Sequence, residues 1–173
     1  MSARHGRNVA LRLGGLRDII SVERVIIGAK QPRVSEKLRS IAAPSAILLG
    51  VGLMRRVNHL MDSIGARAIG QEYRDYTIVA TVDGRIVGAC MINTALGRDP
   101  MVWFLGPIAV LNSHRGKGIG TLLINEALRL VRTHKGRRIF LSVASDNRSA
   151  IALYQKCGFH KTETDTAMIY EYD

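Results

Sequence analysis

The chain has few cysteines, few aromatic residues and no long apolar segment. Its two cysteines, Cys90 and Cys157, stand far apart and outside any CxxC pattern, which excludes a disulfide scaffold and a cysteine-rich zinc site. The longest uncharged stretch, residues 40–54, includes a proline and is shorter than the about 20 apolar residues of a membrane-spanning helix. His114 and His160 lack metal-ligand spacing. We therefore expect a cytoplasmic, globular protein with reduced thiols, no bound metal and no membrane segment.

Positive charge is abundant and unevenly distributed. Lysine and arginine number 25 against 14 acidic residues, and the excess lies in residues 1–40 and 111–140. This distribution indicates a polyanionic ligand. Nucleic acid is a weak candidate, because aromatic residues make up only 5% of the chain and base-stacking surfaces require them. With 173 residues and no repeat or linker, the chain is expected to form one domain over 1–173, with residues 1–8 as a flexible basic N-terminus.

Hydrophobic periodicity predicts a mixed α/β order. Strands are expected at residues 9–13, 76–82, 85–92, 101–110, 138–143 and 167–172, and Asp83-Gly84 favours a tight hairpin between the second and third. Helices are expected from Asp18 to a stop at Gly28, from Ser45 to Ile64, after the glycines at 116–120 as far as Gly136, and after Asn147. Pro107 cannot donate a ladder hydrogen bond, so its strand should be bulged or unpaired on one side.

The segment Arg115-Gly116-Lys117-Gly118-Ile119-Gly120 joins an apolar strand to an apolar helix. Unpaired backbone N–H groups at a helix N-terminus bind anions, and glycine lets a phosphate approach the backbone closely. A pyrophosphate is the natural ligand for such a loop, although a glycine-rich turn can also serve tight packing alone. The spacing matches neither GxxxxGK[ST] nor GxGxxG, so neither a P-loop nor a Rossmann fingerprint is present.

Two motifs in the sequence resemble one known family. Gly106-Pro-Ile-Ala-Val110 followed by Arg115-x-x-Gly118-x-Gly120 resembles the acyl-CoA loop of the GNAT N-acetyltransferase superfamily. The segment from Asn147 to Phe159 is similar to the same family's C-terminal CoA-side helix and the start of the next strand. The resemblance implies an α/β fold of the mixed α+β kind, with a central twisted, mostly antiparallel sheet. Its fourth and fifth strands would splay apart, with helices flanking the sheet.

The resemblance also implies a role for particular residues. Backbone groups of Ile108, Ala109 and Val110 would bind the pantetheine of coenzyme A, and Val110 N–H is the expected donor to the carbonyl oxygen of the acyl group. Asn147 would contact the cofactor or cap its helix, and both roles are compatible. Tyr154 would contact the donor and protonate the departing thiolate as the catalytic general acid. The residues expected to cradle the pyrophosphate are Arg115, Gly116, Lys117, Gly118, Ile119 and Gly120.

The function implied is transfer of an acetyl group from acetyl-CoA to a primary amine by direct attack in a ternary complex. The amine acceptor could be a small molecule or a protein, and a homodimer is possible. The general base is missing, because the run from Met101 to Leu105 lacks the glutamate that family members often place there. Substitutes considered are Glu72, Asp75, Asp99 and the His59–Asp62 pair. The missing base leaves a second interpretation open: a non-catalytic acyl-CoA-binding sensor.

Overall fold

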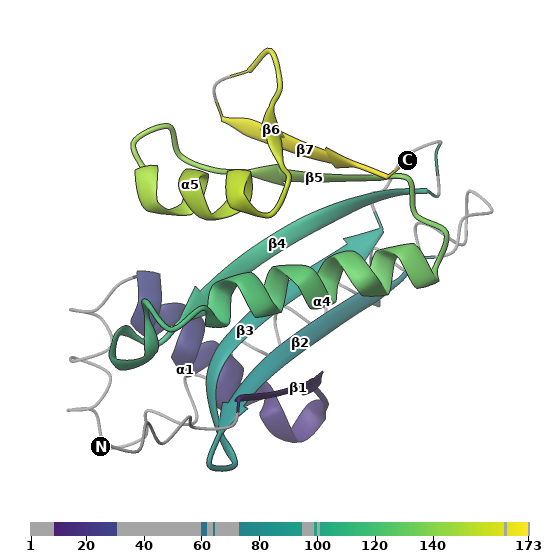
Figure 1. Ribbon diagram of the computed structural model, residues 1–173. Coiled ribbons are helices and arrows are strands. Elements are labelled where there is room, and N and C mark those ends of the chain that lie inside the picture. Colours follow the sequence, from purple (N-terminus) through teal and green to yellow (C-terminus); the bar gives the residue numbers. More distant parts are fainter. Residues whose placement is uncertain are drawn as a thin grey trace, which may run out of the picture.

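The protein forms a seven-stranded sheet with helices on both faces (Figure 1). This computed structural model describes residues 9–30, 60–61, 64, 73–94, 99, 101–164 and 166–172. The strand order is β1-β2-β3-β4-β5-β7-β6, and all neighbours are antiparallel except β4 and β5. The strands are β1 Val9–Leu13, β2 Asp75–Val82, β3 Arg85–Thr94, β4 Val102–Val110, β5 Arg138–Ser142, β6 His160–Lys161 and β7 Ala167–Glu171. The helices are η1 Leu16–Asp18, α1 Ile19–Lys30, η2 Asn112–His114, α4 Ile119–Thr133 and α5 Arg148–Lys156.

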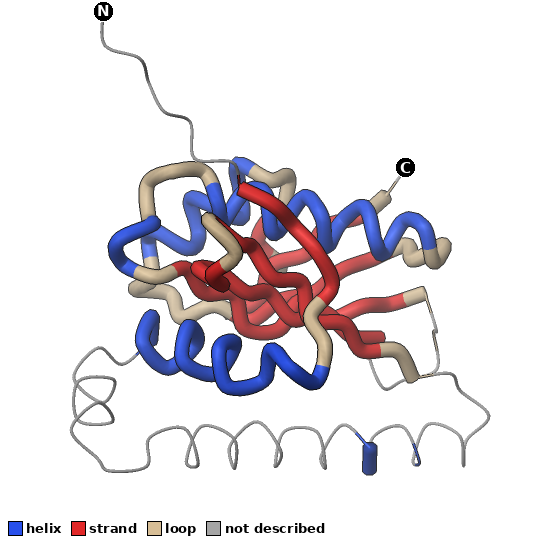
Figure 2. Tube along the Cα trace, turned by 90° about the horizontal axis from the view of Figure 1, so that it is seen from below, coloured by secondary structure: helices blue, strands red, loops and turns tan. Residues whose placement is uncertain are grey.

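Two hydrophobic clusters hold the helices to the sheet. On one face, α4 and α5 pack against Ile78, Ile92, Trp103 and Leu141, which are at most 2% exposed. On the other face, Val22, Val25 and Ile26 of α1 contact Val79, Ala89 and Ala109. Figure 2 shows the sheet with helices on both sides. The expected mixed sheet flanked by helices is confirmed, and burial of these side chains is the main force that holds it together.

Most elements follow the sequence pattern, and the differences have local causes. The β2–β3 turn has positive φ at Asp83 (51°) and Gly84 (72°), as a tight hairpin requires. The prediction that Gly28 ends the first helix is wrong, because α1 continues to Lys30. Helix α4 ends at Thr133, before Gly136, and the positive φ lies at Lys135. The short strand β6 was not predicted.

Gly136 is required by packing rather than by its backbone angles. A Cβ atom there would lie 2.3 Å from Val131 Cγ1 and 2.7 Å from Trp103 Nε1. Of the expected helix from Ser45 to Ile64, only residues 60, 61 and 64 are described, and these three are helical. The rest of that prediction, and the N-terminal residues 1–8, lie outside the described residues. No helix in the described part of the chain is long and apolar enough to cross a membrane.

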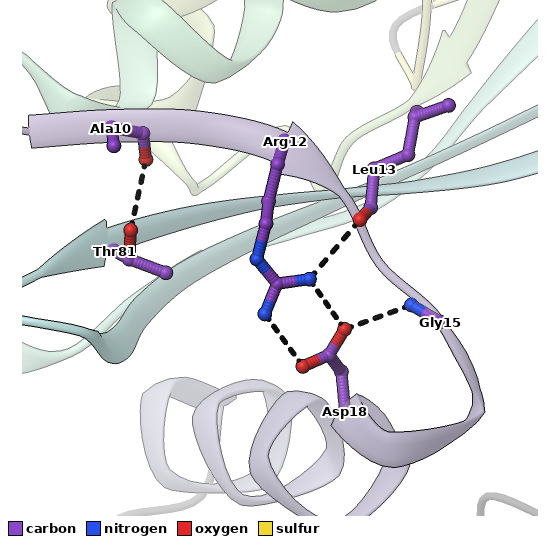
Figure 3. A network of polar contacts seen from close by, with 6 residues as sticks. All are labelled: Ala10, Arg12, Leu13, Gly15, Asp18 and Thr81. Atoms are coloured by element: carbon purple, nitrogen blue, oxygen red, sulfur yellow. Dashed lines mark hydrogen bonds and ion pairs between the residues drawn. The ribbon is translucent and has the colours of Figure 1, made fainter.

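An ion pair fixes the corner between β1 and α1 (Figure 3). The Arg12 guanidinium donates to both carboxylate oxygens of Asp18 at 2.7 Å, and the Gly15 N–H donates to Asp18 Oδ2 at 2.8 Å. These hydrogen bonds, Arg12 first, lower the pKa of Asp18 to about 2. The carboxylate is largely shielded, with 13% of its side chain exposed, whereas the Arg12 side chain is 49% exposed.

Asp18→Asn is expected to lower the free energy of unfolding at neutral pH by about 1 kcal/mol, since solvent screens the exposed arginine. The pKa of Asp18 is lower in the folded than in the unfolded chain, so this stabilisation is complete above about pH 4 and disappears as the pH falls through 2. Urea unfolding between pH 7 and pH 2 should show the wild-type advantage shrinking steadily below about pH 4. Glu171→Gln removes the more exposed Arg138–Glu171 pair and serves as the control, with a smaller expected loss. An Asp18→Asn penalty that stays constant with pH would contradict this explanation.

Candidate functional site

A cleft opens where β4 and β5 separate. The two parallel strands pair at only three positions, Val102 with Arg138, Trp103 with Ile139 and Phe104 with Phe140. Just beyond this seam β4 bulges, since Cys90 of β3 faces Ile108 while Ile92 faces Leu105. The extra residue falls at Gly106-Pro107, as expected for a proline that cannot join a ladder. The bulge bends a strand and increases its twist, which directs the rest of β4 away from β5.

The separated part of β4 directs backbone groups into the opening. Leu111 N–H donates to Val87 O of β3 at 2.8 Å. Peptide N–H groups alternate between the two edges of a strand, so the N–H groups of Ile108 and Val110 face the β5 side. Both residues line the cleft. These positions can therefore hydrogen-bond an extended amide chain that lies between the strands.

The glycine loop closes one end of the cleft at the N-terminus of α4. Gly116 and Gly118 have φ of +71° and +78°, values that L side chains rarely adopt. Leu122 N–H makes the first intrahelical bond, to Gly118 O at 3.0 Å, and Gly118 provides no side-chain cap. The N–H groups of residues 119–121 therefore remain available to a ligand, in a position where the helix dipole favours negative charge.

Helix α5 forms the opposite wall. The Asn147 Oδ1 atom caps it, accepting from Ala150 N–H at 3.2 Å and from Ser149 Oγ at 3.1 Å, so the capping prediction is confirmed. The two walls meet at Gly120, where a Cβ atom would lie 3.0 Å from Leu153 Cδ2. The cleft encloses about 820 Å³ and is lined by Ile108, Ala109, Val110, His114, Arg115, Gly116, Gly118, Ile119, Gly120, Thr121, Asn147, Ser149, Ala150, Leu153 and Lys156.

Tyr154 lies behind the α5 wall and points into the protein. Its side chain is 6% exposed and packs at 5.9 Å between ring centroids against Phe159. Burial, and to a smaller extent nearby Cys90, raises the pKa of the Tyr154 hydroxyl to about 12. Cys90 is in turn the cross-strand partner of Ile108. The phenol is therefore held protonated, and Tyr154, which was predicted to contact the donor, is absent from the residues that line the cleft.

The side chains of the two predicted loop cations, Arg115 and Lys117, lie in different places relative to the cleft. Arg115 lines the cleft, and its Nε–H donates to Val110 O at 3.2 Å, tying the loop to β4. Lys117 is absent from the lining, and its ammonium donates to Ser113 O at 2.8 Å. Backbone N–H groups thus carry more of the anion-binding capacity than the sequence indicated. Six lining residues were not predicted, although each lies within three residues of a predicted one: His114, Thr121, Ser149, Ala150, Leu153 and Lys156.

Of the five candidate bases, the structure describes two, Asp75 and Asp99. Asp75 lies at the start of β2, opposite Asn93 in the ladder. Asp99 is exposed and its Oδ1 accepts from Met101 N–H at 2.9 Å, as a turn-capping residue does. Glu72, His59 and Asp62 lie outside the described residues. No group of three or more His, Cys, Asp or Glu side chains that could hold a metal occurs among the residues described.

A splayed sheet whose opening ends at a glycine-rich helix N-terminus defines a site for a long ligand with an anionic group. The model of the "Acetyltransferase (GNAT) family" matches residues 54–159, which is more than half of the chain. The chain therefore belongs to this family. It is 30% identical over 100 residues to a mycothiol acetyltransferase of Corynebacterium glutamicum, covering 57% of this chain and 32% of that protein. It is 32% identical over 102 residues to an N-alpha-acetyltransferase of Sulfurisphaera tokodaii, and the match covers 54% of this chain and 61% of that protein. The chain thus spans about a third of the first relative's length.

Solved structures confirm the fold class. The PaiA N-acetyltransferase of Thermoplasma acidophilum, in complex with coenzyme A, aligns with a TM-score of 0.66 at 18% identity, over 95% of this chain and 99% of that one. A GNAT family acetyltransferase of Brucella melitensis, in complex with acetyl-CoA, aligns with a TM-score of 0.62 at 20% identity, over 96% and 90%. At such identities the likeness concerns the fold, with its mixed sheet and flanking helices.

Proposed function

We propose that the protein transfers an acetyl group from acetyl-CoA to a primary amine within a ternary complex. The observation that carries the proposal is the cleft itself, which joins unpaired β4 backbone groups to an anion-binding helix N-terminus. Family membership and relatives named as acetyltransferases support it. A cytoplasmic location, a single domain, the absence of a metal and a possible homodimer stay predictions.

Acetyl-CoA would lie in the cleft with its pyrophosphate at the glycine loop and its thioester toward the β4 bulge. Its pyrophosphate would bind the N–H groups of residues 119–121 and the glycine loop. Its pantetheine arm would run along Ile108 and Val110, whose N–H groups face the opening. The thioester would then lie near the β4 bulge, close to Ile108, whose cross-strand partner Cys90 is a neighbour of Tyr154. Two proteins of this fold have been solved in complex with coenzyme A and with acetyl-CoA, which supports acetyl-CoA as the donor.

The chemistry requires two proton transfers. The neutral amine attacks the thioester carbonyl, a C–N bond forms, and the negative charge on oxygen is stabilised by the Val110 N–H. Collapse breaks the C–S bond, and the Tyr154 hydroxyl gives its proton to the departing thiolate. The nitrogen loses its extra proton to water, from which the phenolate is reprotonated. The products are the acetamide and coenzyme A, and one proton is released for each ammonium ion consumed.

Two measurements test the proposal in sequence. Calorimetric titration with acetyl-CoA should show saturable binding, and release of free thiol with an amine panel should show turnover. Binding with no turnover on any amine would favour the sensor interpretation, for which the absence of a carboxylate between Met101 and Leu105 is the supporting observation. If acetyl-CoA does not bind even at low salt, both the acetyltransferase proposal and the sensor interpretation are rejected.

Asn147→Asp separates the two roles of this residue. An aspartate keeps the cap, because its carboxylate accepts from the same Ala150 N–H and Ser149 O–H groups, but it replaces the Nδ2 donor beside the cleft with a negative oxygen. The melting temperature should stay close to that of the wild type while the Kd for acetyl-CoA rises about tenfold. Asn147→Ala, the comparison variant, should lower stability by about 1 kcal/mol as well. Unchanged donor affinity in both variants would assign Asn147 to capping alone.

A further inference from the structure

Helix α4 divides the positive charge of residues 111–140 into two groups. Two of the seven lysine and arginine residues in this stretch, Arg115 and Lys117, lie in the glycine loop before the helix. The other five lie in the last turns of α4 and directly after it: Arg129, Arg132, Lys135, Arg137 and Arg138. The two ends of this 15-residue helix are about 20 Å apart (Figure 1). The phosphates of a donor bound at the glycine loop therefore do not account for the second group.

Two of these five cations are already paired with carboxylates. Arg129 lies 2.6 Å from Glu126 on the same helix, and Arg138 of β5 lies 2.9 Å from Glu171 of β7. The other three are exposed, and no acidic side chain in the described part of the chain forms an ion pair with them. We call these three residues the distal basic patch: Arg132, Lys135 and Arg137.

The backbone that carries the distal basic patch is fixed from several sides. Gly136 N–H donates to Val131 O of α4 at 2.9 Å, and Arg137 N–H donates to Met101 O, just before β4, at 2.8 Å. Tyr172 N–H, just after β7, donates to Arg137 O at 3.0 Å. The turn is thus tied to a helix and to two strands. Little backbone order is lost when a ligand binds to such a turn.

Lys135 occupies a position that its own backbone disfavours. Its φ of +58° lies in the left-handed region, where a helix usually places a glycine. The helix dipole favours a cation in the last turn of α4, which accounts for Arg132. Lys135 and Arg137 lie beyond the helix and are exposed, so neither the dipole nor packing accounts for them. A strained, exposed lysine between two exposed arginines indicates that the charge itself has a use.

The surroundings of the patch indicate the kind of partner. Residues 123–138 are all described, and none of their large apolar side chains is exposed. Protein–protein interfaces depend on buried apolar or aromatic anchors, which this surface lacks. A nucleic-acid duplex needs no such anchor, because cations bind its phosphates by releasing counterions. The low aromatic content excludes base stacking but leaves phosphate contacts possible.

We propose that the distal basic patch binds the phosphate backbone of a double-stranded nucleic acid without reading its bases. Each of the three cations would donate to phosphate oxygens, and the arginines can do so through two N–H groups at once. This binding goes beyond acetyl transfer and does not depend on it, because the patch and the cleft lie at opposite ends of α4. Its effect is to concentrate the protein at nucleic acid.

The test measures fluorescence anisotropy of labelled 20-base-pair duplexes of mixed sequence, one of DNA and one of RNA, between 50 and 200 mM KCl. The wild type should bind both, and log Kd should rise with log[KCl] with a slope of about 3, one unit for each cation. Arg132→Ala and Arg137→Ala should each lower the slope by about 1 and raise the Kd about tenfold at 50 mM KCl. Lys135→Gly should weaken binding equally, while the melting temperature rises by about 2 °C because the strain is relieved.

Matched controls remove the same charge elsewhere. Arg85→Ala and Lys161→Ala replace exposed cations outside the patch and should keep the wild-type slope and affinity. Saturating acetyl-CoA should also leave duplex binding unchanged. Equal weakening in the control variants, displacement of the duplex by acetyl-CoA, or no binding at 50 mM KCl would overturn the proposal. Binding of only one of the two duplexes would contradict backbone recognition, and tighter binding of polyglutamate would indicate an acidic protein instead.

Discussion

Gly118→Glu is expected to weaken acetyl-CoA binding by at least about 100-fold, or about 2.7 kcal/mol. Gly118 caps α4 with φ of +78°, and no atom lies within 4 Å of where its Cβ would be. A glutamate fits sterically but strains the backbone and places a carboxylate where the donor pyrophosphate would bind. Its charge opposes the ligand in a position that the helix dipole otherwise makes favourable to anions. Calorimetric titration measures the effect directly.

The chain offers a closely matched control for this substitution. Gly84 in the β2–β3 turn has φ of +72°, and again nothing lies within 4 Å of a Cβ built there. Gly84→Glu therefore brings the same added charge and a comparable backbone strain of about 1 kcal/mol, away from the cleft lining. Wild-type affinity is expected for this variant. Equal losses in the two variants would show that strain or net charge, and not the anion site, explains the result.

Tyr154→Phe is expected to lower kcat by about 100- to 1000-fold with little change in the Kd for acetyl-CoA. The substitution removes only the hydroxyl, and the ring keeps its contact with Phe159. Tyr170→Phe is the control, because Tyr170 belongs to the same aromatic cluster, 5.5 Å from Phe159, and is absent from the proposed chemistry. Steady-state kinetics together with donor titration separate the chemical step from binding.

The pH profile gives a second readout for Tyr154. Because burial raises its pKa to about 12, the phenol stays protonated through the range in which the amine loses its proton. The rate of acetyl transfer should therefore rise with pH as the neutral amine accumulates, and it should not fall again near pH 10. A decline centred at pH 10 in the wild type, absent in Tyr154→Phe, would contradict the buried, protonated state.

The sequence predicted the parts of the site that depend on local backbone chemistry. Pro107 indicated the bulge, the glycines indicated the open turn at the start of α4, and Asn147 indicated the cap, since each requirement is met within a few residues. The features that the sequence could not predict depend on contacts between segments that are distant in the chain. The need for glycine at position 136 comes from Trp103, and Lys117 bonds to Ser113 instead of facing the cleft.

The three-residue seam between β4 and β5 has a consequence for the mechanics of the fold. Strands β1–β4 form one ladder and β5, β7 and β6 another. Among the described residues, β4 and β5 pair at Val102, Trp103 and Phe104 alone, and the Arg137 and Arg138 N–H groups add bonds to Met101 O at the same end. A donor bound in the cleft would add hydrogen bonds along the separated length of β4. Ligand occupancy would then slow amide hydrogen exchange at Ile108 and Val110 and raise the melting temperature with donor concentration. The cofactor would thus act as part of the sheet.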